Sequence, residues 1–263
     1  MLLWLKIILK EFSLFFRDPN YRIFAILATR YGGKKRNVSG YMSIAGKKFH
    51  TPDNLSVIWQ YYEIFFKRYY RFSPINTASP RIIDIGSNIG LSLTFFTQEY
   101  PNARITAYEA DPTIFSYLKE NSTYFPKAEL INKAVWIHDS GIELHSNGAD
   151  SASILVGKGA TIHVPSISFS EILEKETEID MLKMDIEGAE NNVFTDRTLP
   201  LHKIKNLFLE YHSYKGEEQH LHTILTCLAE NNFRYYFMDG VSKPHTDAGT
   251  LDLQCNIIAT RNN

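Results

Sequence analysis

The sequence predicts an α/β fold in which a mostly parallel sheet carries helices on both faces. From residue 81 onward, short β-rich runs alternate with helical patterns, and repeated βα units of this length are typical of a parallel sheet. The first of these runs, 81–85, leads into a glycine-containing turn, a common ligand-binding feature of such folds. The 263 residues suffice for one large domain with an extension, or for two small ones.

Composition and charge exclude several classes of protein. Hydrophobic residues make up 44% and charged residues 22%, which favours a globular chain over a disordered or coiled-coil one. A formal net charge of −1 disfavours a nucleic-acid binder, which needs a basic surface. Two cysteines, Cys227 and Cys255, are too few for a disulfide framework and favour a reducing, cytoplasmic compartment. The charge is uneven, because residues 1–36 carry eight basic and two acidic side chains.

Residues 1–40 are predicted to form a basic and apolar helical extension. The run 1–17 is too short and too charged to span a membrane, and it lacks the cleavage site of a signal peptide. Wound as a helix, it places Lys6, Lys10 and Arg17 in a narrow stripe on a mostly apolar surface. Such a helix suits peripheral attachment to the inner face of an anionic membrane, or packing on its own domain or on a partner subunit. Periodicity does not separate these alternatives.

Two further patterns precede the alternating part. The apolar run 21–31 predicts a helix that ends at the glycine pair beginning with Gly32. Residues 41–78 predict a lead-in in which a strand-like stretch, 41–49, is followed by a helix capped by Asp53 or Asn54. A Ser- and Pro-containing linker over 73–80 ends this lead-in.

The alternating body, 79–263, is predicted to be the main domain. Strands are expected over 81–85, 104–108, 129–135, 179–184 and 204–209, with an antiparallel closing pair over 235–238 and 253–259. Helices are expected over 91–98, from the cap and N1 proline of Asp111-Pro112, from the Ser168/Glu171 capping box, and over 217–231.

The first two strands end in residues that suit an adenosine-bearing cofactor. Glycines let the backbone approach a ligand, and the following helix offers N–H groups. Glu109 can accept hydrogen bonds from ribose hydroxyls. The spacing is G-x-x-x-G rather than the dinucleotide pattern, and Asp84 would repel a pyrophosphate but could hold an ammonium group. S-adenosylmethionine, which has an ammonium group and no phosphate, therefore fits better, with Asn132 expected near its adenine. The predicted cofactor-binding residues are Asp84, Gly86, Ser87, Asn88, Gly90, Glu109 and Asn132.

Acidic residues follow the fourth and fifth strands of the body. Asp185 ends the fourth strand, while Glu210 and His212 end the fifth. The carboxyl ends of parallel strands share one edge of the sheet, where open α/β folds bind ligands. Glu187 and Glu190 have a simpler interpretation as acids favoured by a helix N-terminus. The strand-end residues are therefore the stronger catalytic candidates.

Four motifs in this order, DIGSNIG, YEADP, LKMDIEGAE and EYHS, resemble the FkbM family of S-adenosylmethionine-dependent methyltransferases over about residues 80–260. The resemblance implies a class I methyltransferase fold, with seven strands of which the last is antiparallel. It also implies O-methylation, often of a sugar hydroxyl in a glycan or natural product. By this likeness the cofactor motifs map to Asp84, Gly86, Asn88, Gly90 and Glu109, and the acidic motif to Asp185, Glu187 and Glu190. Ala110 stands where the family commonly has proline.

Methyl transfer to a hydroxyl needs in-line alignment and a group that accepts the proton. We expect His212 to be this base, assisted by Asp185 and Glu210. In the alternative, the same three residues hold a divalent metal that lowers the pKa of the hydroxyl. Of the two mechanisms, we prefer base catalysis without a metal. The expected partner is a glycan or lipid-linked sugar acceptor. Rival interpretations are a methyltransferase of small natural products and a non-catalytic cofactor- or glycan-binding protein of the same fold; the turn disfavours a nicotinamide oxidoreductase.

Overall fold

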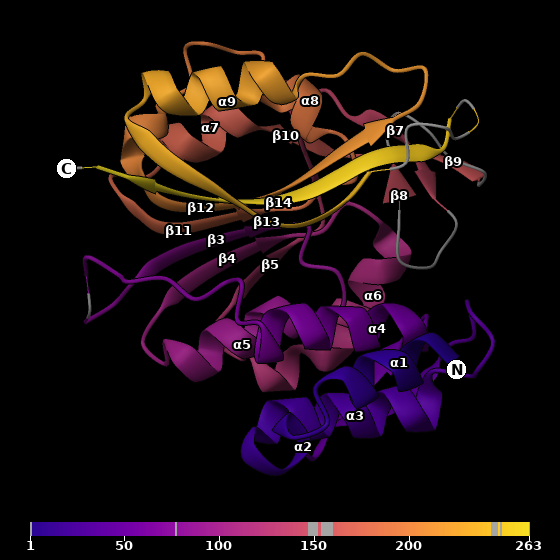
Figure 1. Ribbon diagram of the computed structural model, residues 1–263. Coiled ribbons are helices and arrows are strands. Elements are labelled where there is room, and N and C mark those ends of the chain that lie inside the picture. Colours follow the sequence, from indigo (N-terminus) through magenta and orange to yellow (C-terminus); the bar gives the residue numbers. More distant parts are fainter. Residues whose placement is uncertain are drawn as a thin grey trace.

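The computed structural model describes residues 2–76, 78–146, 152–153, 160–242, 247 and 249–262. Residue 77 of the predicted linker lies outside this part. A seven-stranded sheet forms the centre (Figure 1). Its order is β13 (Phe233–Ser242), β14 (Leu251–Arg261), β12 (Ile204–Tyr214), β11 (Ile179–Met184), β3 (Arg81–Ile85), β4 (Arg104–Tyr108) and β5 (Glu129–Ile131). β14 runs antiparallel to both of its neighbours, β13 and β12, whereas the other strand pairs in this sheet are parallel. This confirms the predicted fold and the antiparallel closing pair.

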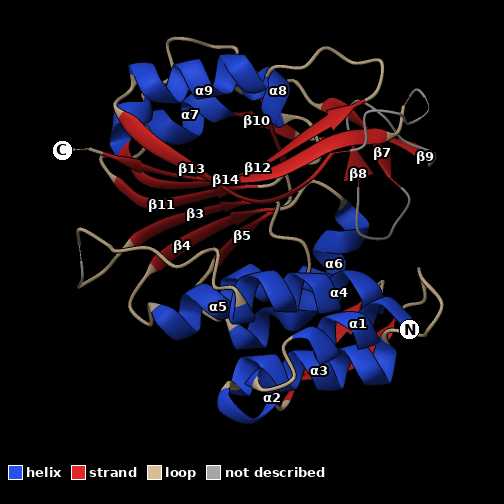
Figure 2. Ribbon diagram, viewed as in Figure 1, coloured by secondary structure: helices blue, strands red, loops and turns tan. Residues whose placement is uncertain are grey.

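Helices cover both faces of the sheet, as Figures 1 and 2 show. On one face lie α7 (Phe169–Glu174), α8 (Glu190–Val193) and α9 (Leu221–Glu230), and on the other lie α4 (Asn54–Tyr61), α5 (Leu91–Glu99) and α6 (Pro112–Glu120). Every residue of β11 is buried, because both of its faces are covered. The polar residues at the carboxyl end of β11 therefore lie in the interior of the protein, where they become part of a site.

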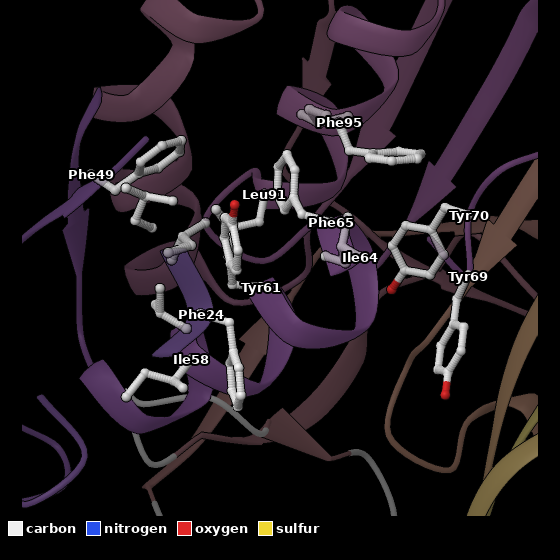
Figure 3. Close-up of a cluster of buried hydrophobic side chains, with 14 of the residues drawn as sticks. Phe24, Phe49, Ile58, Tyr61, Ile64, Phe65, Tyr69, Tyr70, Leu91 and Phe95 are labelled. Carbon is white, nitrogen blue, oxygen red and sulfur yellow. The ribbon is translucent and has the colours of Figure 1, made fainter. Parts of the chain in front are cut away.

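The N-terminal segment packs beside α5, with its first three helices outermost (Figure 1). It comprises α1 (Leu2–Lys10), α2 (Leu14–Arg17), α3 (Pro19–Tyr31), the hairpin of β1 (Gly40–Ile44) and β2 (Lys47–Thr51), α4, and the π-helix η1 (Tyr62–Phe66). Figure 3 shows Tyr61 and Phe65 lying beside Leu91 and Phe95 of α5. One hydrophobic core continues from Trp4 through these side chains to the sheet. The segment is thus part of the structure that covers one sheet face.

Several predicted helix ends are confirmed. Asp53 caps α4 by accepting a hydrogen bond from the Ser56 N–H, and Asp111 caps α6. Helix α3 ends at Gly32. The capping box at α7 is wrong, because the Ser168 side chain makes no capping hydrogen bond and Glu171 pairs instead with Lys175 at 2.5 Å.

Other elements differ from the sequence pattern. The stretch 41–49 is not one strand but the β1–β2 hairpin, whose turn places Ala45 and Gly46 at positive φ. The run 129–135 splits after β5, and β6 (Ala134–Trp136) pairs with β10 (Ser166–Ser168) instead. A small sheet of β7 (Ile142–Ser146), β8 (Ala152–Ser153) and β9 (Ala160–Val164) was not predicted. Helix α9, Leu221–Glu230, is shorter than the helix predicted over 217–231. Two short 3₁₀ turns, η2 (Asn121–Tyr124) and η3 (Leu201–Lys203), complete the fold. No helix in the described ranges is long and apolar enough to cross a bilayer.

Candidate active site

The glycine turn after β3 is pressed against the end of β11. Gly86 has φ +81°, and a Cβ atom there would lie 1.8 Å from the carbonyl oxygen of Asp185. Its N–H and that of Ser87 both donate to the carbonyl oxygen of Tyr108, at 2.9 and 3.0 Å. Only glycine tolerates this contact and this φ together. The turn is therefore locked between β4 and β11, and its position sets the geometry of both neighbouring loops.

Gly90 has a different role from the one predicted. It is the N-cap of α5 at φ +92°, and a Cβ atom there would lie 2.5 Å from the Phe125 ring. It allows α5 to pack closely on Phe125, and it does not line the cleft beside the turn. The predicted direct contact of Gly90 with a cofactor is therefore replaced by a packing role.

A cleft of about 660 Å³, partly open to solvent, runs from the glycine turn past the end of β4. Glu109 lines it and accepts two backbone hydrogen bonds of 2.9 Å, from the N–H groups of Asn88 and Asp111. Burial raises the pKa of Glu109 to about 7, although these two hydrogen bonds oppose the shift. Each carboxylate oxygen has a second lone pair, so Glu109 can still accept hydrogen bonds from a bound ribose. The residues of this cleft fit the predicted cofactor.

The side chain of Asn132 holds the backbone at the end of β4, beside the cleft. Its side-chain Nδ2 group donates to the carbonyl oxygens of Glu109 and Ala110, at 2.8 and 3.2 Å. This amide group therefore fixes the end of β4 instead of reaching toward an adenine. Apolar side chains that the sequence analysis overlooked, Ile114, Val135 and Leu144, line the cleft. Their apolar character suggested only core packing, and Leu144 lies on a strand that was not predicted.

Asp84 lies beneath the turn rather than in the cleft. Its carboxylate is fully buried and accepts a 2.5 Å hydrogen bond from the Ser92 hydroxyl. The other oxygen lies 3.5 Å from the Lys183 ammonium. Because these neighbours occupy it, we correct the prediction that Asp84 holds the ammonium group of a ligand. It holds the cation of Lys183 instead.

Lys183 was missed by the sequence analysis, although a lysine inside the apolar run of β11 was a signal. Its Nζ donates to the carbonyl oxygen of Gly86 at 2.5 Å and lies 3.6 Å from Asp185 Oδ2. Burial acts to lower the pKa of Lys183, but Asp84 and Asp185 outweigh it and raise the pKa above its usual value. A buried ammonium therefore links the glycine turn to the acidic loop.

The structure brings together all five predicted acidic-cluster residues: Asp185, Glu187, Glu190, Glu210 and His212. The fully buried Glu190 shapes the loop, because its two oxygens accept hydrogen bonds from the N–H groups of Ile186 and Gly188, at 2.7 and 2.8 Å. Glu187 sits between them at φ +56°, a strained value for a residue with a side chain. The loop therefore presents Asp185 and Glu187 outward while Glu190 holds it from within.

His212 lies among three carboxylates. Its Nδ1 is 3.6 Å from Glu190 Oε1, and its Nε2 is 3.5 Å from Glu210 Oε1 and 3.8 Å from Glu187 Oε2. Burial acts to lower the pKa of His212, but the surrounding carboxylates, Glu187 first, raise it well above 6.5. An imidazolium has a proton on both ring nitrogens, so it has no lone pair with which to accept another. These carboxylates therefore favour the imidazolium form of His212, which disfavours its predicted role as general base.

The carboxylates around His212 differ in their readiness to accept a proton. Burial, and then Glu210, raise the pKa of Asp185 to about 6, and burial raises that of Glu187 to about 8. Burial opposes ionisation of Glu210 as well, but hydrogen bonds from His212 and Gln254 outweigh it and lower its pKa. A general base works best with a pKa near the working pH and in its ionised form. Asp185 meets both conditions.

A divalent cation is the alternative use of this cluster. Ligand atoms of Asp185, Glu190 and His212 lie within 4.8 Å of one another. This group differs from the predicted one, because Glu190 takes the place of Glu210, whose carboxylate accepts a hydrogen bond from Gln254. Carboxylates and a neutral imidazole suit a divalent metal, and such binding would require His212 to lose its proton.

A second cleft, of about 1230 Å³ including open solvent, meets the first. Gly86, Asn88, Asp185 and Glu187 line both. Ser87, predicted to bind the cofactor, lines only the second cleft, where its hydroxyl donates to the carbonyl oxygen of Asp84. The two clefts thus converge on the glycine turn and two carboxylates, with separate space on either side for two reactants.

A Rossmann-like sheet, a glycine turn beside the buried carboxylate of Glu109, and a second cleft lined by acids are the features of a class I, S-adenosylmethionine-dependent transferase. The chain belongs to the methyltransferase FkbM domain family, whose model matches residues 84–235. This confirms the predicted family, the methyltransferase activity and the S-adenosylmethionine cofactor.

Two curated proteins are similar to this chain. The 2-O-methyltransferase NoeI of Sinorhizobium fredii is 25% identical over 169 residues, and the methyltransferase sdnD of Sordaria araneosa is 25% identical over 185 residues. Each match covers 55% of this chain and 70% of the relative. Among solved structures, M. jannaschii TYW2 in complex with AdoMet has a TM-score of 0.47 and 16% identity, covering 87% of this chain and 89% of that one.

Proposed function

We propose that this methyltransferase transfers a methyl group to a hydroxyl of a sugar in a glycan or glycolipid precursor. The observation that carries the proposal is the convergence of two clefts on Asp185 and Glu187. A hydroxyl is a weak nucleophile and needs a nearby base. The carboxylates at the junction supply one, and the name of the relative NoeI, an O-methyltransferase, supports an oxygen acceptor.

The first cleft is the proposed cofactor site. Glu109 accepts hydrogen bonds from the ribose, and the backbone at Gly86 and Asn88 forms the wall beside it. Bound S-adenosylmethionine supplies the methyl group as an electrophilic sulfonium. The negative charge of Asp185 at the junction favours a cationic centre at that position.

The second cleft holds the acceptor, and its residues perform the proton chemistry. Asp185 accepts the hydroxyl proton as the oxygen attacks. His212, as an imidazolium, stabilises Glu187, Glu190 and Glu210 in place. Fixed charges of this kind need no reorganisation during the reaction. The acidic lining also disfavours an anionic acceptor, because the carboxylates would repel it.

The N-terminal helices support a peripheral position at the cytoplasmic face of a membrane. Trp4 and Ile8 pack into the core, so α1 does pack on its own domain. However, Leu9 of α1, Phe12 of the following turn and Phe16 of α2 are 60%, 51% and 70% exposed. The exposed basic residues Lys6, Lys10 and Arg17 flank them. Apolar side chains beside lysines and arginines suit binding to an anionic leaflet. A lipid-linked sugar acceptor would lie in the same leaflet.

Mass spectrometry of cell-surface glycans with and without the gene tests the acceptor. We expect one glycan class to lose the mass of one methylene per modified sugar when the gene is deleted, and to regain it with the wild-type gene but not with Asp185→Asn. An unchanged glycan profile, together with methyl transfer to a small secreted compound, would favour the natural-product alternative.

A further inference from the structure

The acceptor cleft has a wall that lies outside the matched methyltransferase domain. Trp59, Gln60, Glu63 and Tyr70 line this cleft opposite the acidic loop. All four precede residue 84, where the family match begins. The catalytic edge therefore belongs to the shared domain, whereas the facing wall belongs to the N-terminal segment of this chain. A surface with that origin is well placed to select the acceptor.

The backbone geometry of this wall is unusual. Residues Tyr62–Phe66 form a π-helix, closed by a 2.9 Å hydrogen bond from the Lys67 N–H to the Tyr62 carbonyl oxygen. π-helical turns are rare and occur frequently at functional sites. Here the turn buries Ile64 and Phe65 in the core while Glu63 faces the cleft. Figure 3 shows Ile64 and Phe65 directed toward the packed side chains of the core.

The charge around Glu63 favours a neutral acceptor. Burial, and then Glu210 and Asp185 across the cleft, raise the pKa of Glu63 to about 8. At neutral pH its carboxyl group therefore carries a proton and can both donate and accept a hydrogen bond. Hydroxyl groups match such a partner in either direction. A carboxylate or phosphate on the acceptor would instead meet the negative charges of Asp185 and Glu210. The two basic residues of the same cleft do not cancel them, because Arg36 pairs with Asp53 and Lys183 also pairs with the buried Asp84.

Trp59 gives the same wall a fixed apolar surface. Its ring lies 4.5 Å from that of Trp4, centroid to centroid, and 6.3 Å from that of Tyr62. The residue is 38% exposed and lines the cleft. A hydrogen bond from the Tyr69 hydroxyl to Asp239 ties the following turn to β13. The wall therefore combines a held aromatic face with a neutral carboxyl group.

We propose that Trp59 and Glu63 form an acceptor subsite for a neutral sugar ring, in which Trp59 contacts its apolar face and Glu63 hydrogen-bonds one of its hydroxyls. This inference rests on the proposed sugar acceptor, and it assigns the selection of that acceptor to the N-terminal segment. It also gives a role to residues of the acceptor cleft that the family model does not include.

Ligand-detected NMR on the full-length protein tests the subsite. The probes are the methyl glycosides of glucose, galactose and mannose, each paired with its uronic acid, at about 10 mM, a concentration that detects weak ligands. S-adenosylhomocysteine is added at saturation so that no turnover occurs, and its own affinity is measured by calorimetry. The variants are Trp59→Ala, Glu63→Ala and Glu63→Gln. Glu11→Gln is the matched control, because Glu11 lies in the same segment and does not line the cleft.

We expect at least one neutral glycoside to bind wild type, and its uronic acid to bind at least about tenfold more weakly. Trp59→Ala and Glu63→Ala should each weaken glycoside binding about tenfold, the effect of losing one good contact. S-adenosylhomocysteine affinity should stay within about twofold. Glu63→Gln, which can still donate and accept, and Glu11→Gln should bind the glycoside as wild type does.

Glycoside binding that survives both alanine variants would overturn the subsite and leave the proposed function standing. Equal binding of a glycoside and its uronic acid would overturn the selection by charge. If S-adenosylhomocysteine binds but no neutral glycoside does, the sugar acceptor and the subsite both fall. Loss of S-adenosylhomocysteine binding in Glu63→Ala would show that Glu63 supports the fold, and this too would reject a role confined to the acceptor.

Discussion

The Lys183 ammonium donates a hydrogen bond of 2.5 Å to the carbonyl oxygen of Gly86. The same Nζ lies 3.5 Å from Asp84 and 3.6 Å from Asp185. One buried cation thus joins the strand that carries the glycine turn to the strand that carries the acidic loop. Since the two clefts meet at Gly86 and Asp185, the cofactor and acceptor sides of the site share this support.

Replacing Lys183 with methionine should destabilise the protein by about 3–5 kcal/mol, because Asp84 is left as an uncompensated buried charge. Urea unfolding measures the loss. The double variant Lys183→Met/Asp84→Asn removes that charge and should regain much of the stability. Both variants should bind the cofactor more weakly than wild type, since each lacks the ammonium that contacts Gly86 and Asp185. Equal stability of the single and double variants would contradict the ion pair as the cause.

Cofactor affinity should fall as pH decreases through about 7, the pKa to which burial raises Glu109. Below that pH the carboxyl group is protonated, so it loses an acceptor for the ribose and the negative charge that favours a cation. If only the ionised form binds, affinity at pH 6 should be about tenfold weaker than at pH 8. The apo protein should show the opposite trend, because the folded state holds this proton more tightly between about 4.5 and 7 and loses stability as pH rises.

Calorimetry from pH 5.5 to 8.5 checks the affinity trend, and Glu109→Gln is the control. This variant cannot ionise at position 109, so its affinity should be about 1.5–3 kcal/mol weaker at pH 8 and nearly independent of pH. A variant that keeps the wild-type pH dependence would assign the effect to Asp185 or Glu187 instead.

Asp185→Asn should lower kcat by about 10²–10⁴, the usual contribution of a general base. S-adenosylhomocysteine affinity should change little, because this product carries no sulfonium charge and the base acts only when the acceptor is present. His212→Gln should also lose turnover, since it removes the cation that stabilises three carboxylates. Rates measured as S-adenosylhomocysteine release test both. A normal rate in His212→Gln would remove this residue from the mechanism.

Chelation separates base catalysis from metal catalysis. With Asp185 as base and His212 as an imidazolium, EDTA should leave the rate unchanged. In the alternative, EDTA abolishes activity and a divalent ion restores it.

The exposed phenylalanines of the N-terminal helices should determine membrane binding. The double variant Phe12→Ser/Phe16→Ser should bind anionic vesicles at least about tenfold more weakly, because each ring loses apolar burial. Ile137→Ser, at a residue that is 51% exposed on the body, is the matched control. Point variants are preferable to deleting the helices, since Trp4 packs on Trp59 and its removal would open the core.

Vesicle sedimentation at low and high salt measures this binding. High salt should release part of the wild-type protein, since it screens Lys6, Lys10 and Arg17. Wild-type protein that stays in the supernatant with anionic vesicles at low salt would reject peripheral attachment. In that case the exposed face of α1 and α2 has no membrane role.

The sequence alone determined the order of the main strands of the central sheet, the family, and which residues approach the catalytic edge. These features are local, because a glycine turn, a cap or a strand-end carboxylate follows from neighbouring residues. Asp111 caps α6 and Glu109 faces the turn as predicted. Parallel topology then brings the ends of β11 and β12 together, so that Asp185 and His212 meet.

Only the tertiary structure decided what those residues do. A pKa depends on burial and on charges from other strands, so the pattern could not show that His212 is held as a cation among Glu187, Glu190 and Glu210. Likewise, nothing near Asp84 in the sequence reveals Lys183, which reaches it from the adjacent strand. Glu63 lines the acceptor cleft because the core packs its neighbours Ile64 and Phe65, and the same cleft includes Glu210, more than a hundred residues away in the sequence. Long-range packing, rather than local pattern, sets these roles.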